Sequence, residues 1–222
     1  MGKTVSLTSK DGHKFDAYRA DPAGKPKGAL VVIQEIFGVN RHMRSVCDGY
    51  AKDGYLCIAP ALFDRVAKGI ELGYGPDDMP KARDTRGALK WDDVLADVAA
   101  AQDAVKGNGK TGILGYCYGG SVAWLGATRM NFACAVSYYG GNVAEFANEK
   151  PKCPVICHIG SEDGSINAEK VAIIKKAQPD VPVYIYQGAG HGFNCDERGS
   201  WNEAAAKLAR GRTLEFLAKH IG

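Results

Sequence analysis

The sequence predicts an α/β fold, in which a mostly parallel sheet of seven or eight strands carries helices on both faces. Apolar, strand-like runs alternate with helix-like segments through most of the 222 residues. Several runs, such as Ala29–Ile33, are apolar throughout, as strands covered on both faces are. The chain opens with two alternating segments on either side of Asp11-Gly12, which predicts an antiparallel hairpin at the start of the sheet.

The elements can be placed in order along the chain. Asn40 can cap a helix that ends at Gly54, and regular helical spacing resumes at Trp91. Strands are expected at 3–9, 13–20, 29–33, 55–59, 111–115, 133–138, 155–159 and 183–186, and further helices at 119–128, 168–178 and the C-terminal end.

Two segments carry more specific expectations. In residues 60–90, proline and glycine break any periodicity, which indicates a long functional loop over a site. The last helix is expected to bury one face, formed by Trp201, Ala204, Ala205, Leu208 and Ala209 and continued by Phe216 and Leu217.

Composition limits the class of protein. The length fits one domain, 1–222, and no low-complexity linker marks a boundary. The net charge is +3, and the lysine and arginine residues are scattered along the chain without forming a basic run. This distribution argues against nucleic-acid binding. No secretory leader or run of 18 apolar residues is present, and the seven cysteines have no disulfide-scaffold spacing, so a cytoplasmic protein without membrane contact is expected. Cys153 and Cys157 lack a second pair, which argues against a metal site.

The pentapeptide Gly115-Tyr-Cys-Tyr-Gly119 has the shape of a nucleophile elbow, with Cys117 as the nucleophile. An apolar strand precedes it and a helix rich in small residues follows, which is the context that the motif requires. Glycines on either side leave room for a sharp turn, and the start of a helix favours a thiolate. The alternative is a buried structural cysteine, a common use of a free thiol.

A base and an acid follow at later strand ends. His191 lies between glycines after the strand at 183–186, and Asp163 follows the strand at 155–159. The order nucleophile, acid, base is that of α/β-hydrolases. Glu162 is the rival for the acid, and an Asp-Gly turn is the structural alternative for Asp163. His158, inside an apolar strand, is interpreted as a core histidine.

Four motifs in order resemble the dienelactone hydrolase family, the carboxymethylenebutenolidases: Gln34–Asn40, Pro60–Asp64, Gly115–Gly120 and Ala189–Phe193. The resemblance implies an α/β-hydrolase fold without a large cap domain and a triad of Cys117, His191 and Asp163. It also gives Glu35 the role of contacting the cysteine and helping to generate thiolate. A carboxylate among apolar neighbours is compatible with that role, and a salt bridge or helix-cap contact is the alternative.

The expected chemistry follows from these residues. The backbone N–H groups of Ile36 and Tyr118 are expected to form an oxyanion hole for a lactone or ester carbonyl attacked by Cys117. Ring opening gives a thioester, and His191 activates water to release the acid. Neither a metal nor an organic cofactor is needed.

One position departs from the family. The resemblance places an arginine for the substrate carboxylate four residues after the histidine, where this chain has Cys195. Arg83, Arg86 and Arg198 are the candidate substitutes for an anionic substrate, since a planar carboxylate favours an arginine fork. Phe37 is a further candidate for substrate binding.

Three functional hypotheses result. The first is a dienelactone hydrolase-like enzyme for small, possibly anionic lactones or esters, acting through a thioester. The second is a general carboxylesterase or thioesterase. The third is a non-catalytic binding module, because a fold alone does not establish activity.

Overall fold

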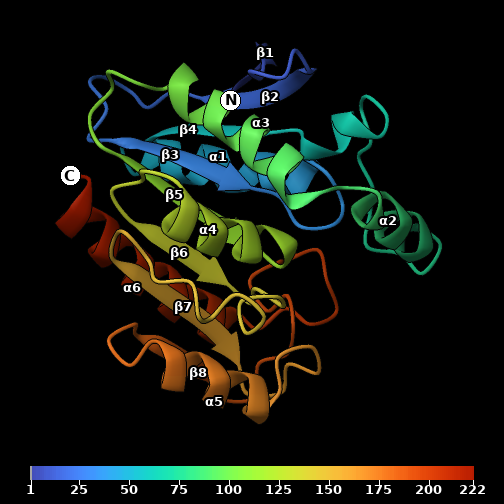
Figure 1. The fold of residues 1–222 in the computed structure, drawn as a ribbon, viewed down its shortest axis with the longest axis vertical. Coiled ribbons are helices and arrows are strands. Elements are labelled where there is room, and N and C mark those ends of the chain that lie inside the picture. Colours follow the sequence, from blue (N-terminus) through green and yellow to red (C-terminus); the bar gives the residue numbers. More distant parts are fainter. Residues whose placement is uncertain (1) are drawn as a thin grey trace. The chain divides into compact units, whose positions relative to one another are not determined.

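The computed structural model describes residues 2–222 (Figure 1). Their chain forms two compact units: unit 1 runs to Gly112 and includes Ile221, and unit 2 comprises Ile113–His220 and Gly222. Each unit is described in turn. That the whole chain, 1–222, is one domain stays a prediction.

Unit 1 contains the predicted hairpin. Its strands are β1 (Lys3–Thr8), β2 (Lys14–Ala20), β3 (Ala29–Ile33) and β4 (Leu56–Pro60), in the order β1-β2-β4-β3. β1 pairs with β2 and β2 with β4 in antiparallel fashion, whereas β3 and β4 are parallel. All five residues of β3 are buried, as its continuous apolar sequence predicts.

Two helices cover the strands of unit 1. α1 (Arg41–Lys52) packs on β2 and β4, and α3 (Trp91–Ala104) packs on β1, β3 and β4 from the other face (Figure 1). The predicted cap of α1 is confirmed, because the Asn40 side chain accepts a hydrogen bond from the Met43 amide at 3.2 Å.

The prediction of an irregular stretch at 60–90 is wrong in part. This stretch contains a 3₁₀ helix, η1 (Leu62–Arg65), and α2 (Asp78–Gly87). α2 buries only Ala82 and Thr85, so its sequence carries no apolar period. Pro80 lies in its first turn, where the missing N–H is not needed. Among the described residues, this connection between β4 and the next strand is the longest, and it contains no large cap domain.

Unit 2 is built on parallel strands. They are β5 (Thr111–Tyr116), which starts just before the boundary, β6 (Ala135–Tyr138), β7 (Val155–Gly160) and β8 (Val183–Tyr186), in chain order. All three pairings between them are parallel. The carboxyl ends of the four strands therefore meet at one edge, which is where α/β sheets bind ligands.

The helices of unit 2 are α4 (Tyr118–Arg129), α5 (Ala168–Ala177) and α6 (Glu203–His220). α4 packs against β6, and α6 lies on the opposite face of the strands (Figure 1). His158 is the core histidine that the sequence predicted: its Nδ1 lies 2.8 Å from the Tyr186 hydroxyl and its Nε2 lies 3.0 Å from the Thr213 hydroxyl.

The predicted buried face of the last helix is wrong in part. Trp201 precedes α6 and is 40% exposed, and Leu208 is 52% exposed. Ala205, Ala209 and Leu217 are buried as predicted, and Ala206 and Thr213 are buried in addition. The Thr213 hydroxyl lies 2.7 Å from that of Tyr138, and this polar contact makes burial of a threonine favourable. An apolar pattern alone could not indicate it.

α4 packs closely against the end of β6 at Gly120, and a substitution there tests this contact. A Cβ added to Gly120 would lie 2.5 Å from the Tyr138 carbonyl oxygen and 3.0 Å from the Gly140 backbone. We expect Gly120→Ala to lower the free energy of unfolding by about 1–3 kcal/mol, because backbone atoms must move apart.

Gly211→Ala is the matched control. Gly211 lies inside α6, is exposed and has no atom within 4 Å of an added Cβ. This variant should be neutral or stabilised by about 0.5–1 kcal/mol, since alanine favours a helix. Urea unfolding midpoints measure both, and equal stability of the two variants would contradict the close approach.

Candidate active site

The candidate nucleophile lies on a strained turn. Cys117 stands between β5 and α4 with φ at 55°, a left-handed value that is uncommon outside glycine. Its amide donates to the Tyr138 carbonyl oxygen at 3.0 Å, and its own carbonyl accepts from the Gly120 amide at 2.9 Å. A Cβ on Gly115 would collide with the Gly119 carbonyl. The flanking glycines are therefore required by a close approach across the turn.

The surroundings of Cys117 suit a reactive thiol. The residue is partly exposed, whereas Cys47, Cys57, Cys134, Cys157 and Cys195 are buried. It lies at the N-terminus of α4, where the positive end of the helix dipole favours a thiolate. The turn thus holds a thiol at the carboxyl edge of the unit 2 strands.

A histidine and an aspartate meet at the same edge. Asp163 follows β7 and His191 follows β8, and the Asp163 Oδ2 lies 2.8 Å from the His191 Nδ1. The Asp163 Oδ1 accepts the amides of Ser165 and Ile166 at 2.8 and 3.1 Å. These bonds hold the buried carboxylate toward the imidazole. Glu162, the rival for this position, is exposed.

The electrostatics of His191 favour its charged form. Burial by itself lowers the pKa of an imidazole, but hydrogen bonds to Asp163 and Cys117, together with their charges, raise it more. The net effect raises the pKa of His191 to about 10. The two partners of His191, Asp163 and the Cys117 side chain, therefore both favour its charged form.

Tyr118 and Arg198 complete the predicted residues in unit 2. Tyr118 is the first residue of α4, so its amide directly follows the nucleophile. A Cβ on Gly192 would collide with the guanidinium of Arg198, so this side chain lies directly over the backbone beside His191. Gly192 also has a φ of 78°, which favours glycine.

Glu35, Ile36 and Phe37 lie in unit 1, in the loop after β3. The Glu35 side chain is fully buried, and Ile36 packs with Phe37 in an apolar cluster. The Leu72 amide donates to the Phe37 carbonyl at 2.9 Å, so part of the 60–90 connection folds over this loop. The predicted contact of Glu35 with the thiol and the role of the Ile36 amide stay predictions.

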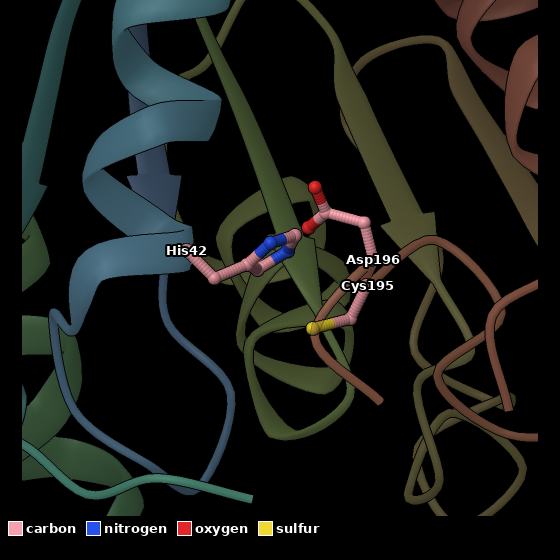
Figure 2. Close-up of side chains that lie close together, drawn as sticks. All are labelled: His42, Cys195 and Asp196. Carbon is pink, nitrogen blue, oxygen red and sulfur yellow. The ribbon is translucent and has the colours of Figure 1, made fainter. Parts of the chain in front are cut away.

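The other candidate arginines lie on α2. Arg83 is exposed, and the Arg86 guanidinium stacks 4.4 Å above the Trp91 ring. Cys195, at the position where the family resemblance places an arginine, is buried in the loop before α6. Figure 2 draws it with its neighbour Asp196 and with His42 of α1. A buried thiol gives a substrate carboxylate no cationic partner at that position.

Sequence reasoning missed the end of β6. Tyr138 supplies the carbonyl that accepts the Cys117 amide, and the Tyr139 ring lies 5.1 Å from the His191 ring. Both follow from the pairing of β6 between β5 and β7, which only the folded chain fixes. The sequence Tyr-Tyr-Gly-Gly at a strand end was the available signal.

In the part of the chain described here, residues 2–222, no helix combines the length and the apolar character needed to cross a bilayer.

The chain is similar in sequence to a known family of proteins. The model of the dienelactone hydrolase family matches residues 15–221. The carboxymethylenebutenolidase of Pseudomonas putida is 34% identical over 226 residues, which cover 96% of this chain and 95% of that protein. Carboxymethylenebutenolidase 1 of Cupriavidus pinatubonensis is 30% identical, over 96% of this chain and 95% of its own length.

Solved structures agree with the sequence relatives. A Klebsiella pneumoniae protein assigned as a dienelactone hydrolase superposes with a TM-score of 0.82 at 29% identity, covering 98% of this chain and all of that one. A dienelactone hydrolase-like promiscuous phosphotriesterase from metagenomic libraries has a TM-score of 0.78 at 18% identity over 100% of this chain and 99% of its own, which shows the fold alone. The prediction of an α/β-hydrolase fold is confirmed. The chain belongs to the dienelactone hydrolase family and is a hydrolase of ester or lactone bonds.

Proposed function

We propose that this enzyme opens small lactones and esters of the dienelactone type through a thioester on Cys117. The observation that carries the proposal is the hydrogen-bonded series Asp163, His191 and Cys117, with the cysteine on a left-handed turn at a helix N-terminus. A base held by a carboxylate and bonded to a thiol is the arrangement that nucleophilic catalysis requires. Membership of the family favours an enzyme over the non-catalytic binding module.

The proposed first half-reaction forms the thioester. The Cys117 thiolate attacks the carbonyl carbon, and the amide of Tyr118, with that of Ile36, receives the negative charge of the tetrahedral intermediate. The carbon–oxygen bond of the ring then breaks. The departing oxygen takes a proton from the His191 imidazolium, which leaves the imidazole neutral.

The second half-reaction uses that neutral imidazole. His191 accepts a proton from water, the resulting hydroxide attacks the thioester carbonyl, and the acid departs while the thiolate returns. Asp163 keeps the imidazole oriented in both halves. Glu35 is proposed as an additional proton acceptor that helps to generate the thiolate when substrate binds. These steps use side chains, backbone amides and water, and the absence of a need for a cofactor or metal stays a prediction.

A general carboxylesterase or thioesterase is the second candidate. The observation that favours it is Cys195, a buried thiol where the family resemblance places an arginine for the substrate carboxylate. Within unit 2, Arg198 is the candidate cation beside His191. The two candidates differ in whether the enzyme prefers an anionic substrate. A cytoplasmic location stays part of the proposal.

Replacement of the nucleophile tests the mechanism. Cys117→Ala should lose about a thousand-fold or more in kcat on a dienelactone or a p-nitrophenyl ester, because the step that forms the thioester is gone. Cys153→Ala, which removes another partly exposed thiol, should keep wild-type activity.

Alkylation supplies a second measurement on the same thiols. Brief iodoacetamide treatment and peptide mapping should label Cys117 first, since burial raises the pKa of Cys153 to about 11. Substantial turnover by Cys117→Ala, or preferred labelling of another cysteine, would show that the nucleophile is wrongly assigned.

The acid can be tested with a matched pair. Asp163→Asn should lower kcat by about 10²–10⁴-fold, because the imidazole loses the partner that orients it and favours its charge. Glu162→Gln, at the adjacent exposed position, should retain activity.

The pH dependence of the pair has a definite sign. Asp163 raises the pKa of His191, so the imidazolium is lost when the pH rises through that value. The activity of Asp163→Asn should therefore decline at a lower pH than that of the wild type, in a kcat profile between pH 6 and 11. An unchanged profile, or a larger loss in Glu162→Gln, would assign the acid elsewhere.

Substrate charge can be assigned with single arginine variants. If Arg198 binds the carboxylate, Arg198→Ala should lower kcat/KM for an anionic lactone by about ten- to a hundred-fold, as a charge-assisted hydrogen bond predicts. A neutral ester of similar size should be affected much less. Arg83→Ala and Arg86→Ala, on α2, test the other two candidate arginines with the same pair of substrates. Equal losses on both substrates would give Arg198 a structural role, and no loss in any variant would favour the general esterase.

A further inference from the structure

The end of β6 contacts both candidate reacting residues. We call Tyr138–Gly140 the β6 corner. The Tyr138 carbonyl oxygen accepts the Cys117 amide at 3.0 Å. The Tyr139 ring meets the His191 ring at a centroid distance of 5.1 Å and an interplanar angle of 62°. Two adjacent residues therefore touch the thiol-bearing turn and the base.

Tyr139 has an unusual backbone conformation. Its φ is 38°, and among residues 2–222 only Cys117 shares a positive φ without being glycine. A bulky residue in this region is strained and persists only where its surroundings fix it, a situation that is concentrated at functional sites. Gly140 follows directly and would have carried such a turn without strain. The position of the Tyr139 ring gives a physical reason for the strain.

The ring of Tyr139 is held from several directions. The residue is fully buried, and its amide donates to the His158 carbonyl oxygen at 2.7 Å, which continues the pairing of β6 with β7. The Phe193 ring contacts the Tyr139 ring at 5.3 Å in a T-shaped arrangement. A ring fixed in this way restricts the imidazole that packs against it.

The β6 corner is also fixed to the start of α4. A Cβ on Gly140 would lie 2.8 Å from the Gly120 carbonyl carbon, so the two backbones touch. The Asn142 amide donates to the Ser121 hydroxyl oxygen at 3.0 Å. The corner, the turn at Cys117 and the imidazole therefore form one packed assembly within unit 2.

The groups around His191 determine how strongly its protonated form is favoured, and the uncharged Tyr139 ring is one of these groups. Asp163 and Cys117 favour the imidazolium, and the Arg198 guanidinium lies over the adjacent Gly192 backbone. An aromatic ring within about 6 Å of a cation attracts it through the ring quadrupole. The centroid of the Tyr139 ring lies within this distance of the His191 ring, and a tyrosine adds no charge that would repel an anionic substrate.

We propose that Tyr139 is a positioning residue for hydrolysis: its ring holds the His191 imidazole against Cys117 and favours its protonated form. The Tyr138 carbonyl holds the nucleophile from the same corner. The proposal rests on the proposed function, in which His191 is the acid and base for a Cys117 thioester.

Three variants distinguish the effect of the Tyr139 ring on His191 from the effects of its hydroxyl group and of general packing. Tyr139→Phe keeps the ring and should retain wild-type kcat. Tyr139→Leu removes the aromatic face and should lower kcat by about three- to thirty-fold, the range of one cation–aromatic contact, with KM within about two-fold. Tyr184→Leu is the matched control, because this half-buried tyrosine stacks on His158 at 5.6 Å instead of on His191.

The decisive readout is the titration of His191. NMR of the imidazole should give a midpoint about 0.5–1 pH unit lower in Tyr139→Leu than in wild type, and an unchanged midpoint in Tyr139→Phe and Tyr184→Leu. The kcat profile of Tyr139→Leu should move in the same direction. If Tyr139→Leu does not fold, Tyr139→Gly, which suits the left-handed backbone, removes the ring and should show the same shift.

The outcomes are distinct. An unchanged His191 midpoint in both ring-deleted variants, or a Tyr139→Phe variant as impaired as Tyr139→Leu, would overturn the role of the ring. An equal kcat loss in Tyr184→Leu would assign the effect to general packing. Retained activity in Cys117→Ala would instead overturn the proposed function, and the NMR titration would still report on the contact between Tyr139 and His191.

Discussion

The left-handed backbone at Cys117 is the constraint on which the geometry of the candidate site depends. β5 ends at Tyr116 and α4 begins at Tyr118, so the chain changes direction within one residue. So sharp a turn brings the backbone of the strand close to that of the helix, which requires residues without side chains. Gly115 meets Gly119 across the turn, and Gly120 meets the end of β6. The same contacts direct the Cys117 amide to the Tyr138 carbonyl. The small residues of α4 therefore permit the turn at Cys117 as well as the packing of the helix.

Opposing electrostatic effects act on His191. Burial disfavours its charge, whereas the carboxylate of Asp163 and the thiol of Cys117 favour it, and the partners prevail. Asp163 can exert this effect because two backbone amides hold its second oxygen and keep it buried beside the imidazole. A nearby histidine, His158, shows the contrary case: burial and the charge of Arg212 lower its pKa to about 3, so it stays a neutral member of the core. The pKa values of the two histidines thus shift in opposite directions, because only His191 has a carboxylate partner.

The departure from the family at Cys195 concerns recognition rather than the reacting groups. The thiol, imidazole and carboxylate are all contributed by unit 2, whereas the position at which the family resemblance places an arginine holds a buried thiol. Arg198, three residues further along the same loop, lies over Gly192 beside the base. The proposed cation for a substrate carboxylate is therefore adjacent to the proposed base.

The sequence by itself determined the order of the elements and the turn at Cys117, and it predicted Cys117, Asp163 and His191 as nucleophile, acid and base, because glycine spacing and apolar runs are local signals. It left Asp163 and Glu162 as neighbours of equal chemistry, and the folded loop separates them by directing one to His191 and the other to solvent. The sequence did not predict α2, because this helix buries few apolar residues. It did not predict the burial of Thr213, because that depends on a hydroxyl contact with a distant residue. The contacts of Tyr138 and Tyr139 depend on β6 lying between β5 and β7. Pairing of distant strands is a property of the tertiary structure, and no local pattern encodes it.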